Sequence, residues 1–155
     1  MIVYICGHEV IIDEEDIEMI KSKKWHHKHY SGGIYFSSYD KRINGINKHH
    51  RLHRIIIGIG YGEKIIVDHI NGNTLDCRKE NLRTCTIQQN LMNSKISKTN
   101  KTGYKGVSVF GEKFRSTISV NRKQVHLGLF NCPTTAWLAY VRAAIELHGE
   151  FARFS

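Results

Sequence analysis

The 155-residue sequence has only four cysteines and no long run of apolar residues. No two cysteines form a CxxC pair, which argues against a zinc-ribbon site and a structural zinc ion and favours reduced thiols. The sequence also lacks a secretory leader. Without a leader or an apolar segment of bilayer length, we expect a soluble, cytoplasmic protein with no membrane partner.

Acidic residues are also scarce, because 14 aspartates and glutamates stand against 23 lysines and arginines, for a formal net charge of +9. Residues 95–155 hold ten basic and three acidic residues, a local excess of +7. Such a region is typical of proteins that bind a phosphate backbone, with an affinity that falls steeply as salt rises. A basic patch alone fits an anionic membrane surface equally well, but the lack of an apolar segment favours nucleic acid.

The stretch VDHINGNTLDCRKENLRTCTIQQN combines an acidic residue and a histidine, Asp68 and His69, with two asparagines, Asn81 and Asn90. A carboxylate suits Mg²⁺, and an imidazole with the ordinary pKa of about 6.5 is substantially neutral near pH 7 and can accept a proton from water. This pairing predicts hydrolysis of a phosphodiester bond.

Local patterns predict the structure around these four residues. The β-branched run Glu63 to Val67 predicts a strand that ends at Asp68 and His69, and Asn71-Gly72 predicts a tight turn. Leu82 to Thr84 predicts a second strand. Thr86 with Gln89 fits a capping box that opens a short helix, through about Asn93, with Asn90 in it.

This order of strand, loop, strand and helix, preceded by HRLHRIIIG, resembles the ββα-metal core of the HNH endonucleases, specifically their phage and intron-encoded homing group, over about residues 50 to 94. The resemblance implies that Asp68 and Asn90 bind the metal, Mg²⁺ or Mn²⁺. It implies that His69 is the general base and that Asn81 orients the loop and ring of His69. Asn90 stands where the family name has a histidine, a variant of the homing branch. The alternative is an ordinary hairpin loop with capping asparagines.

The C-terminal third predicts a second structured region. Gly106 to Phe110, Lys113 to Val120 and Lys123 to Phe130 alternate in polarity between turn signals, which predicts a three-stranded antiparallel sheet. Pro133 starts a helix with apolar residues at helical spacing, and Gly149 is placed to end it. We expect the helix to cover one face of the sheet.

The motifs GYKGV, KF, HLGLF and AY in this region resemble the plant-type AP-two/ERF DNA-binding domain. The resemblance implies that the exposed sheet face enters the major groove of DNA, a known mode of β-sheet recognition. The alternative is a solvated sheet face with ordinary surface charge. The positions that correspond to the DNA-facing ones are Lys105, Ser108, Lys113, Arg115, Thr117, Ser119, Gln124 and His126.

The remaining segments are less informative. Residues 95–102 read KISKTNKT and are either a linker that lies along DNA through its lysines or a flexible tether. The N-terminal part predicts strands within Val3 to Ile12, a helix over Asp13 to Lys24, a hairpin of Ile34 to Ser38 with Ile43 to Ile46, and a helical run from Arg51 to Ile57. The basic residues expected to contact the DNA backbone are Lys48, Arg51, Arg54, Lys95, Lys98 and Lys101.

Histidines are frequent in the N-terminal part but match no standard metal-site spacing, which favours surface or DNA-facing positions. They are His26, His27, His29, His49, His50 and His53.

These patterns predict an α+β protein: a ββα-metal (HNH) nuclease core with an N-terminal α/β buttress in residues 1–94, a basic linker in 95–102, and a small sheet with one helix in 103–155. The expected function is a homing-type, metal-dependent endonuclease in a phage-infected or intron-bearing cell. It would nick double-stranded DNA as a monomer, or cut both strands as a dimer. Two alternatives stay open: a non-catalytic sequence-specific DNA-binding regulator, and a low-specificity DNA or RNA nuclease.

Overall fold

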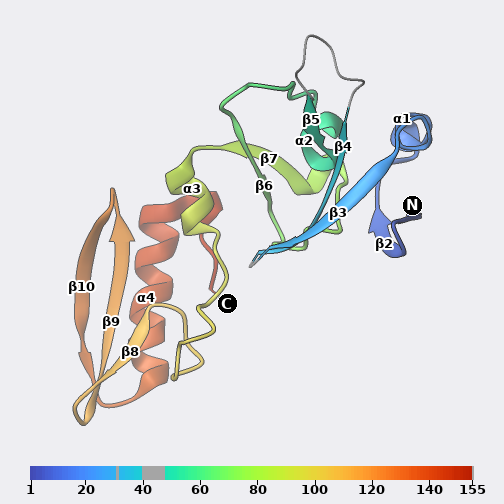
Figure 1. Cartoon of the computed structure of the whole chain (residues 1–155). Helices are drawn as coiled ribbons and strands as arrows, with labels where there is room; N and C mark the ends of the chain where they lie inside the picture. The colour runs from blue at the N-terminus through green and yellow to red at the C-terminus, as the bar shows by residue number, and fades with distance from the viewer. Residues whose placement is uncertain (31, 40–47, 155) are drawn as a thin grey trace. The chain divides into compact units, whose positions relative to one another are not determined.

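The computed structural model describes residues 1–30, 32–39 and 48–154 and divides into two compact units, Met1–Cys85 and Thr86–Ser155 (Figure 1). Both units combine antiparallel strands with helices, which confirms the predicted α+β class. None of the helices formed by the described residues has the length and apolarity needed to cross a membrane.

The described residues of the first unit form three small sheets, namely the hairpin β1–β2, the sheet β3–β4–β5 and the hairpin β6–β7. Its elements are β1 (Ile2–Ile5), β2 (His8–Ile11), η1 (Glu14–Asp16), α1 (Ile17–Lys21), β3 (Trp25–Tyr30), β4 (Gly33–Tyr39), β5 (His49–Arg51), α2 (Leu52–Ile56), β6 (Ile66–His69), η2 (Lys79–Asn81) and β7 (Leu82–Cys85). The predicted N-terminal strands and the helical run at α2 are confirmed. The helix expected over residues 13–24 is shorter, because it begins as the 3₁₀ turn η1.

The strand predicted over Ile34 to Ser38 is part of β4. The strand paired with β4 along its length is β3, whose sequence WHHKHY has no β-branched residue and almost no buried side chain. Its strand conformation comes from pairing with β4, where Phe36 is buried, rather than from local propensity. The segment Ile43 to Ile46 lies outside the described residues.

One hydrophobic core joins the N-terminal elements to the β6–β7 hairpin. Its buried members are Ile5, Val10, Ile12, Ile20, Phe36, Leu52, Ile56, Cys77 and Leu82. Each buried aliphatic or aromatic side chain of this size contributes about 1.5–3 kcal/mol to folding. Because β1, β2, α1, β4 and α2 all contribute to it, the expected N-terminal buttress of the β6–β7 hairpin is confirmed.

Strand β6 begins at Ile66 rather than at Glu63. The guanidinium of Arg54 donates hydrogen bonds to the backbone carbonyls of Glu63, at 2.8 Å, and of Ile65. These carbonyls are therefore satisfied outside a β-ladder. The other end of the strand is as predicted, because Asp68 and His69 are its last two residues.

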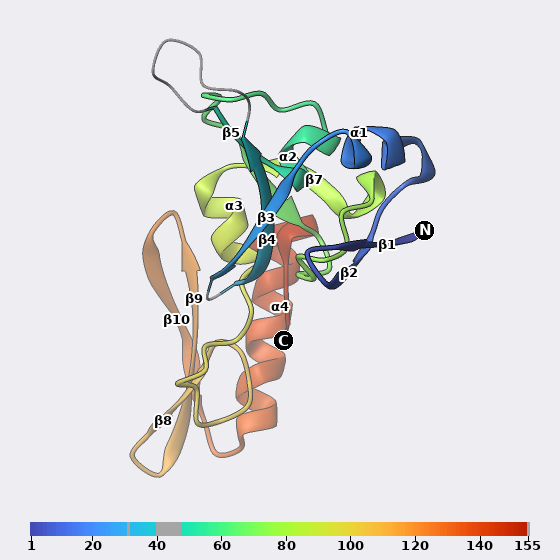
Figure 2. The same cartoon turned by 45° about the vertical axis from the view of Figure 1, so that its right-hand side comes forward.

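The second unit is a three-stranded sheet, in the order β10–β9–β8, with the long helix α4 beside it in both views (Figures 1 and 2). Its elements are α3 (Ile87–Met92), β8 (Val107–Phe110), β9 (Lys113–Val120), β10 (Lys123–Phe130), α4 (Pro133–His148) and η3 (Gly149–Phe151). The predicted sheet and helix are confirmed. Ile118, Tyr140 and Ala144 form the core between β9 and α4.

One local prediction in this unit is also confirmed by side-chain geometry. Thr86 and Gln89 form the predicted capping box at the start of α3. Gly106, in the GYKGV motif, has a φ of 76°, and a Cβ there would overlap the ring of Tyr140. Only glycine combines this backbone conformation with so close an approach of the helix α4.

The segment before β8 is hydrogen-bonded into the second unit. Asn100 Oδ1 accepts from the backbone N–H groups of Thr102, at 2.8 Å, and Gly103, at 3.0 Å. Its Nδ2 donates to the carbonyls of Tyr104 and Val107, both at 3.0 Å. The end of the predicted linker is therefore a fixed turn, while Lys95, Lys98 and Lys101 are exposed on the segment leading to it.

Candidate functional site

Asp68 and His69 are buried at the end of β6, with 7% and 4% of their surfaces exposed. In the β6–β7 register Asp68 lies opposite Arg83. Arg83 donates to Asp68 Oδ2 from Nε at 3.2 Å and from Nη2 at 3.1 Å. This cross-strand pair fixes the carboxylate at the strand end. Sequence reasoning missed Arg83, which could have been found from opposite charges once the register was known.

The imidazole of His69 lies among side chains from three different parts of the first unit. Its ring centroid is 5.1 Å from that of His53 on α2 and 6.2 Å from that of Tyr35 on β4. Its Nε2 is 4.0 Å from the Sγ of Cys77, a thiol whose pKa burial raises to about 12. Sequence reasoning missed these neighbours because they come from segments far from His69 along the chain.

Burial lowers the pKa of His69 to about 4, although the carboxylates of Asp68 and Asp76 act in the opposite direction. Burial, with His69 as a further cause, lowers the pKa of His53 to about 3. Both rings are therefore neutral at physiological pH. A neutral imidazole has a free lone pair, so His69 is in the protonation state that a general base requires.

The side chain of Asn81 holds the segment that follows His69. Its Oδ1 accepts from the N–H of Asn71 at 3.0 Å, and its Nδ2 donates to Asn71 Oδ1 at 3.1 Å and to the carbonyl of Asp76 at 2.7 Å. Its carbonyl accepts from the N–H of Ile70 at 2.9 Å. Asn81 thus fixes both ends of the turn after His69.

Asp76 is the second fixed point of this loop, and its role was missed from the sequence. It is 2% exposed and accepts from Arg78 Nε at 2.9 Å, Arg78 Nη2 at 2.8 Å and Asn71 Nδ2 at 2.9 Å. The hydrogen bonds from Arg78 are the main cause that lowers the pKa of Asp76. The same stretch is tied to β2, because Ile11 accepts from the N–H of Cys77 at 2.8 Å. From the sequence alone, an aspartate two residues before an arginine looks the same whether the two form a buried ion pair or an exposed one.

Asn90 lies on α3 in the second unit, where its side chain is exposed and its N–H donates to the carbonyl of Thr86. The structure therefore brings together Asp68, His69 and Asn81 of the predicted site within the first unit. Asn90, the fourth predicted residue, belongs to the second unit.

Most of the predicted DNA-facing residues lie on one face of the β10–β9–β8 sheet, the face that points away from α4. The register pairs Ser108 with Arg115, Thr117 with His126, and Ser119 with Gln124 across the strands. The guanidinium of Arg115 lies 4.7 Å above the ring centre of Phe110. The residues on this face are Ser108, Lys113, Arg115, Thr117, Ser119, Gln124 and His126.

Lys105 precedes β8, and its side chain forms hydrogen bonds within the second unit. Its ammonium donates to the carbonyls of Met92, at 2.9 Å, and Ser94, at 2.5 Å, at the C-terminal end of α3. Burial lowers the pKa of Lys105 to about 8, with Arg153 as a further cause. A cation at this end of a helix satisfies carbonyls that the helix leaves unpaired.

The three basic residues predicted at the N-terminal part differ in their surroundings. Lys48 is exposed just before β5. Arg51 lies 5.7 Å from the ring centres of both Tyr30 and Tyr35. Arg54 donates to backbone carbonyls of the segment before β6, so its guanidinium supports the fold of that segment.

The depressed pKa values of His53 and His69 predict a loss of stability in mild acid. The unfolded chain takes up these protons below about pH 6.5, while the folded protein does so only near pH 4 and pH 3. Each histidine therefore lowers the free energy of unfolding by up to about 1.4 kcal/mol per pH unit below 6.5. Urea unfolding at pH 7.5 and pH 5 measures this. His126→Gln, at an exposed histidine, should show the wild-type dependence, and equal stability of the wild type at both pH values would contradict the prediction.

Comparison with known proteins identifies a matching family model and two viral relatives. The family model described as HNH endonuclease matches residues 50–92. The chain is 37% identical over 91 residues to Protein 3.8 of Escherichia phage T7, a match that covers 57% of this chain and 74% of that protein. It is 35% identical over 117 residues to an uncharacterized HNH endonuclease of Acanthamoeba polyphaga mimivirus, which covers 74% of this chain and 59% of that protein. No solved structure matches significantly.

Proposed function

We propose a function on the premise that this chain carries an HNH endonuclease domain at residues 50–92 and belongs to the family of Protein 3.8 of phage T7. The proposed function is metal-dependent hydrolysis of phosphodiester bonds in double-stranded DNA. The observation that carries it is the buried pair Asp68 and His69 at the end of β6, where a carboxylate adjoins a neutral imidazole. The expected products carry a 5′ phosphate and a 3′ hydroxyl.

His69 is the proposed general base. Its ring is confined by Tyr35, His53 and Cys77, and the turn after it is fixed by Asn81 and by Asp76. A base held in one orientation accepts a proton from water without first losing rotational freedom. Burial keeps the imidazole neutral, so its full population is available near pH 7. Asn81 therefore acts as a positioning residue, through the loop rather than on the substrate.

Asp68 and Asn90 are the proposed ligands of one divalent ion, Mg²⁺ with Mn²⁺ as a substitute. The first unit's donor set fits such an ion, because Asp68 offers a hard carboxylate oxygen and the adjacent His69 is neutral and adds no repelling charge. An amide oxygen from Asn90 has the same hard character. When bound, the ion supplies positive charge to the scissile phosphate and to the leaving 3′ oxygen.

The C-terminal sheet is the proposed reader of the DNA target, in the manner of an AP-two/ERF-like domain. Its support is the face that carries Lys113, Arg115, Gln124 and His126, in a region with a local charge of +7. Polar side chains that project together from neighbouring strands can contact base edges in a major groove. We also propose that the nuclease is of the homing type.

Arg115→Ala should weaken DNA binding about tenfold or more at fixed salt, because an arginine that contacts a base edge or phosphate contributes about 1–3 kcal/mol. Arg142→Ala is the matched control, because it removes the same charge from an exposed position of α4 in the same unit. Fluorescence anisotropy with a labelled duplex measures both affinities. An equal loss in the two variants would mean that net charge, not the sheet face, determines binding.

The proposed function is tested by adding Mg²⁺ to protein bound to duplex DNA in EDTA. An endonuclease breaks strands in the bound DNA once the metal is present. A regulator leaves a shifted but intact duplex at every metal concentration. Equal cleavage of unrelated DNA or of RNA in parallel reactions would instead identify a low-specificity nuclease.

A further inference from the structure

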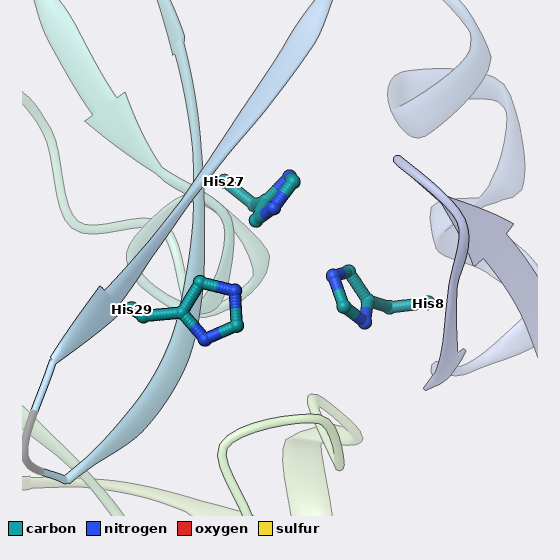
Figure 3. Close-up of side chains that lie close together, drawn as sticks. All are labelled: His8, His27 and His29. Atoms are coloured by element: carbon teal, nitrogen blue, oxygen red, sulfur yellow. The ribbon is translucent and has the colours of Figure 1, made fainter.

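Three histidines from two separate strands converge in the first unit. His8 is the first residue of β2, and His27 and His29 project from one face of β3, because residues two apart in a strand point the same way (Figure 3). One ring nitrogen from each of the three histidines lies within 4.8 Å of the other two. The ring centroids are 4.8 Å apart for His8 and His27, 5.5 Å for His27 and His29, and 6.1 Å for His8 and His29.

These spacings are close to those of a metal centre. Three imidazole nitrogens that bind one tetrahedral ion at about 2.0–2.1 Å lie roughly 3.3 Å apart. Side-chain rotations would bring the three nitrogens to that spacing, and His27 and His29 are exposed and His8 is half-buried, which leaves room for them.

We propose that His8, His27 and His29 bind a transition-metal ion of the Zn²⁺ class, with a fourth position left to water or an external ligand. Neutral imidazole suits Zn²⁺, Co²⁺, Ni²⁺ and Cu²⁺, whereas Mg²⁺ prefers oxygen. The site is therefore distinct in chemistry from the oxygen ligands Asp68 and Asn90. The cysteines predict no structural zinc, because they form no CxxC pair. The three-histidine cluster could not be recognised from the sequence, because His8 is distant from the segment that contains His27 and His29.

The ion would join the β1–β2 hairpin to the β3–β4–β5 sheet. These are separate sheets, and β2 also carries Ile11, which hydrogen-bonds to Leu75 and Cys77 in the loop that follows His69. An ion held by residues of both sheets binds only the folded arrangement and so stabilises it. The bound metal would thus stiffen the strand that supports the nuclease loop.

Co²⁺ titration of the metal-free protein tests the site directly, because tetrahedral Co²⁺ has visible absorption bands that octahedral Co²⁺ in water nearly lacks. The wild type should bind one Co²⁺ with these bands, and added Zn²⁺ should displace it. His27→Ala and His29→Ala, at exposed positions that are not needed for packing, should each weaken Co²⁺ binding at least tenfold. His8→Ala should do the same.

Two further variants separate this site from its neighbours. His26→Ala changes the residue that precedes His27 in β3 and projects from the opposite face of the strand. This variant should bind Co²⁺ as the wild type does. His69→Ala disables the proposed nuclease site and should also keep the bands, so the result does not depend on nuclease activity. Unchanged Co²⁺ binding in His27→Ala and His29→Ala, or loss of the bands in His69→Ala alone, would overturn the proposal.

Thermal unfolding supplies an independent readout of the same site. Zn²⁺ should raise the Tm of the wild type and of His26→Ala, and EDTA should reverse the rise. His27→Ala and His29→Ala should keep the metal-free Tm whether or not Zn²⁺ is present. A Zn²⁺-dependent rise of equal size in these two variants would overturn the assignment of the ligands.

Discussion

Replacing His69 by alanine should slow DNA cleavage by about 100-fold or more while leaving the affinity for DNA unchanged. The substitution removes the proposed proton acceptor but none of the residues on the C-terminal sheet face. Single-turnover cleavage of an end-labelled duplex, at protein concentrations that saturate binding, separates the chemical step from binding. His26→Ala, at an exposed histidine whose ring packs on Tyr39, should cleave at the wild-type rate.

Added imidazole gives this prediction a sharper form. If His69→Ala leaves a space beside Tyr35 and His53, imidazole in solution can take the place of the missing ring and restore part of the rate. A purely structural role for His69 would give no such rescue. Full activity of His69→Ala without imidazole would contradict the assignment of the base.

Asp76→Asn should lower the free energy of unfolding by about 1.5–3 kcal/mol, because it removes the charge-assisted hydrogen bonds that the buried carboxylate of Asp76 accepts from Arg78. Asp76 is 2% exposed and accepts two hydrogen bonds from Arg78 and one from Asn71. The asparagine keeps the volume but loses the charge and one acceptor. Urea unfolding at pH 7.5 measures the change.

Glu80→Gln is the matched control for Asp76→Asn. Glu80 also pairs with Arg78, but its side chain is 69% exposed. Exposed ion pairs contribute about 0–1 kcal/mol, so this variant should be nearly as stable as the wild type. Equal effects of the two substitutions would show that Asp76 is not the point on which the loop depends.

The parts of the fold that could be predicted depend on contacts between residues close in sequence. The capping box of Thr86 and Gln89, the strand β7 and the C-terminal strands each follow from a local pattern of polarity and turn residues. The predicted start of β6 was wrong because Arg54, about ten residues earlier, donates hydrogen bonds to the carbonyls that would have extended the strand.

The parts of the candidate site that could not be predicted depend on tertiary packing. Asp68 and His69 were recognised from their spacing, but their surroundings come from β4, α2 and the loop before η2. The same holds for the strand β3, which has no β-forming pattern of its own, and for His8, which meets His27 only through the fold. A sequence pattern records residue types along the chain, whereas burial and proximity arise only when distant segments pack together.

The most direct measurement of the proposed nuclease is conversion of a supercoiled plasmid carrying the host locus, with purified wild-type protein in Mg²⁺ and in EDTA. We expect open-circle or linear DNA in Mg²⁺, intact supercoiled DNA in EDTA, and no conversion by His69→Ala in either. Open-circle product alone identifies a nicking enzyme, and linear product identifies cleavage of both strands. Supercoiled DNA that stays intact in Mg²⁺ and Mn²⁺, while the protein retards it in a gel, would contradict catalysis and favour a DNA-binding regulator.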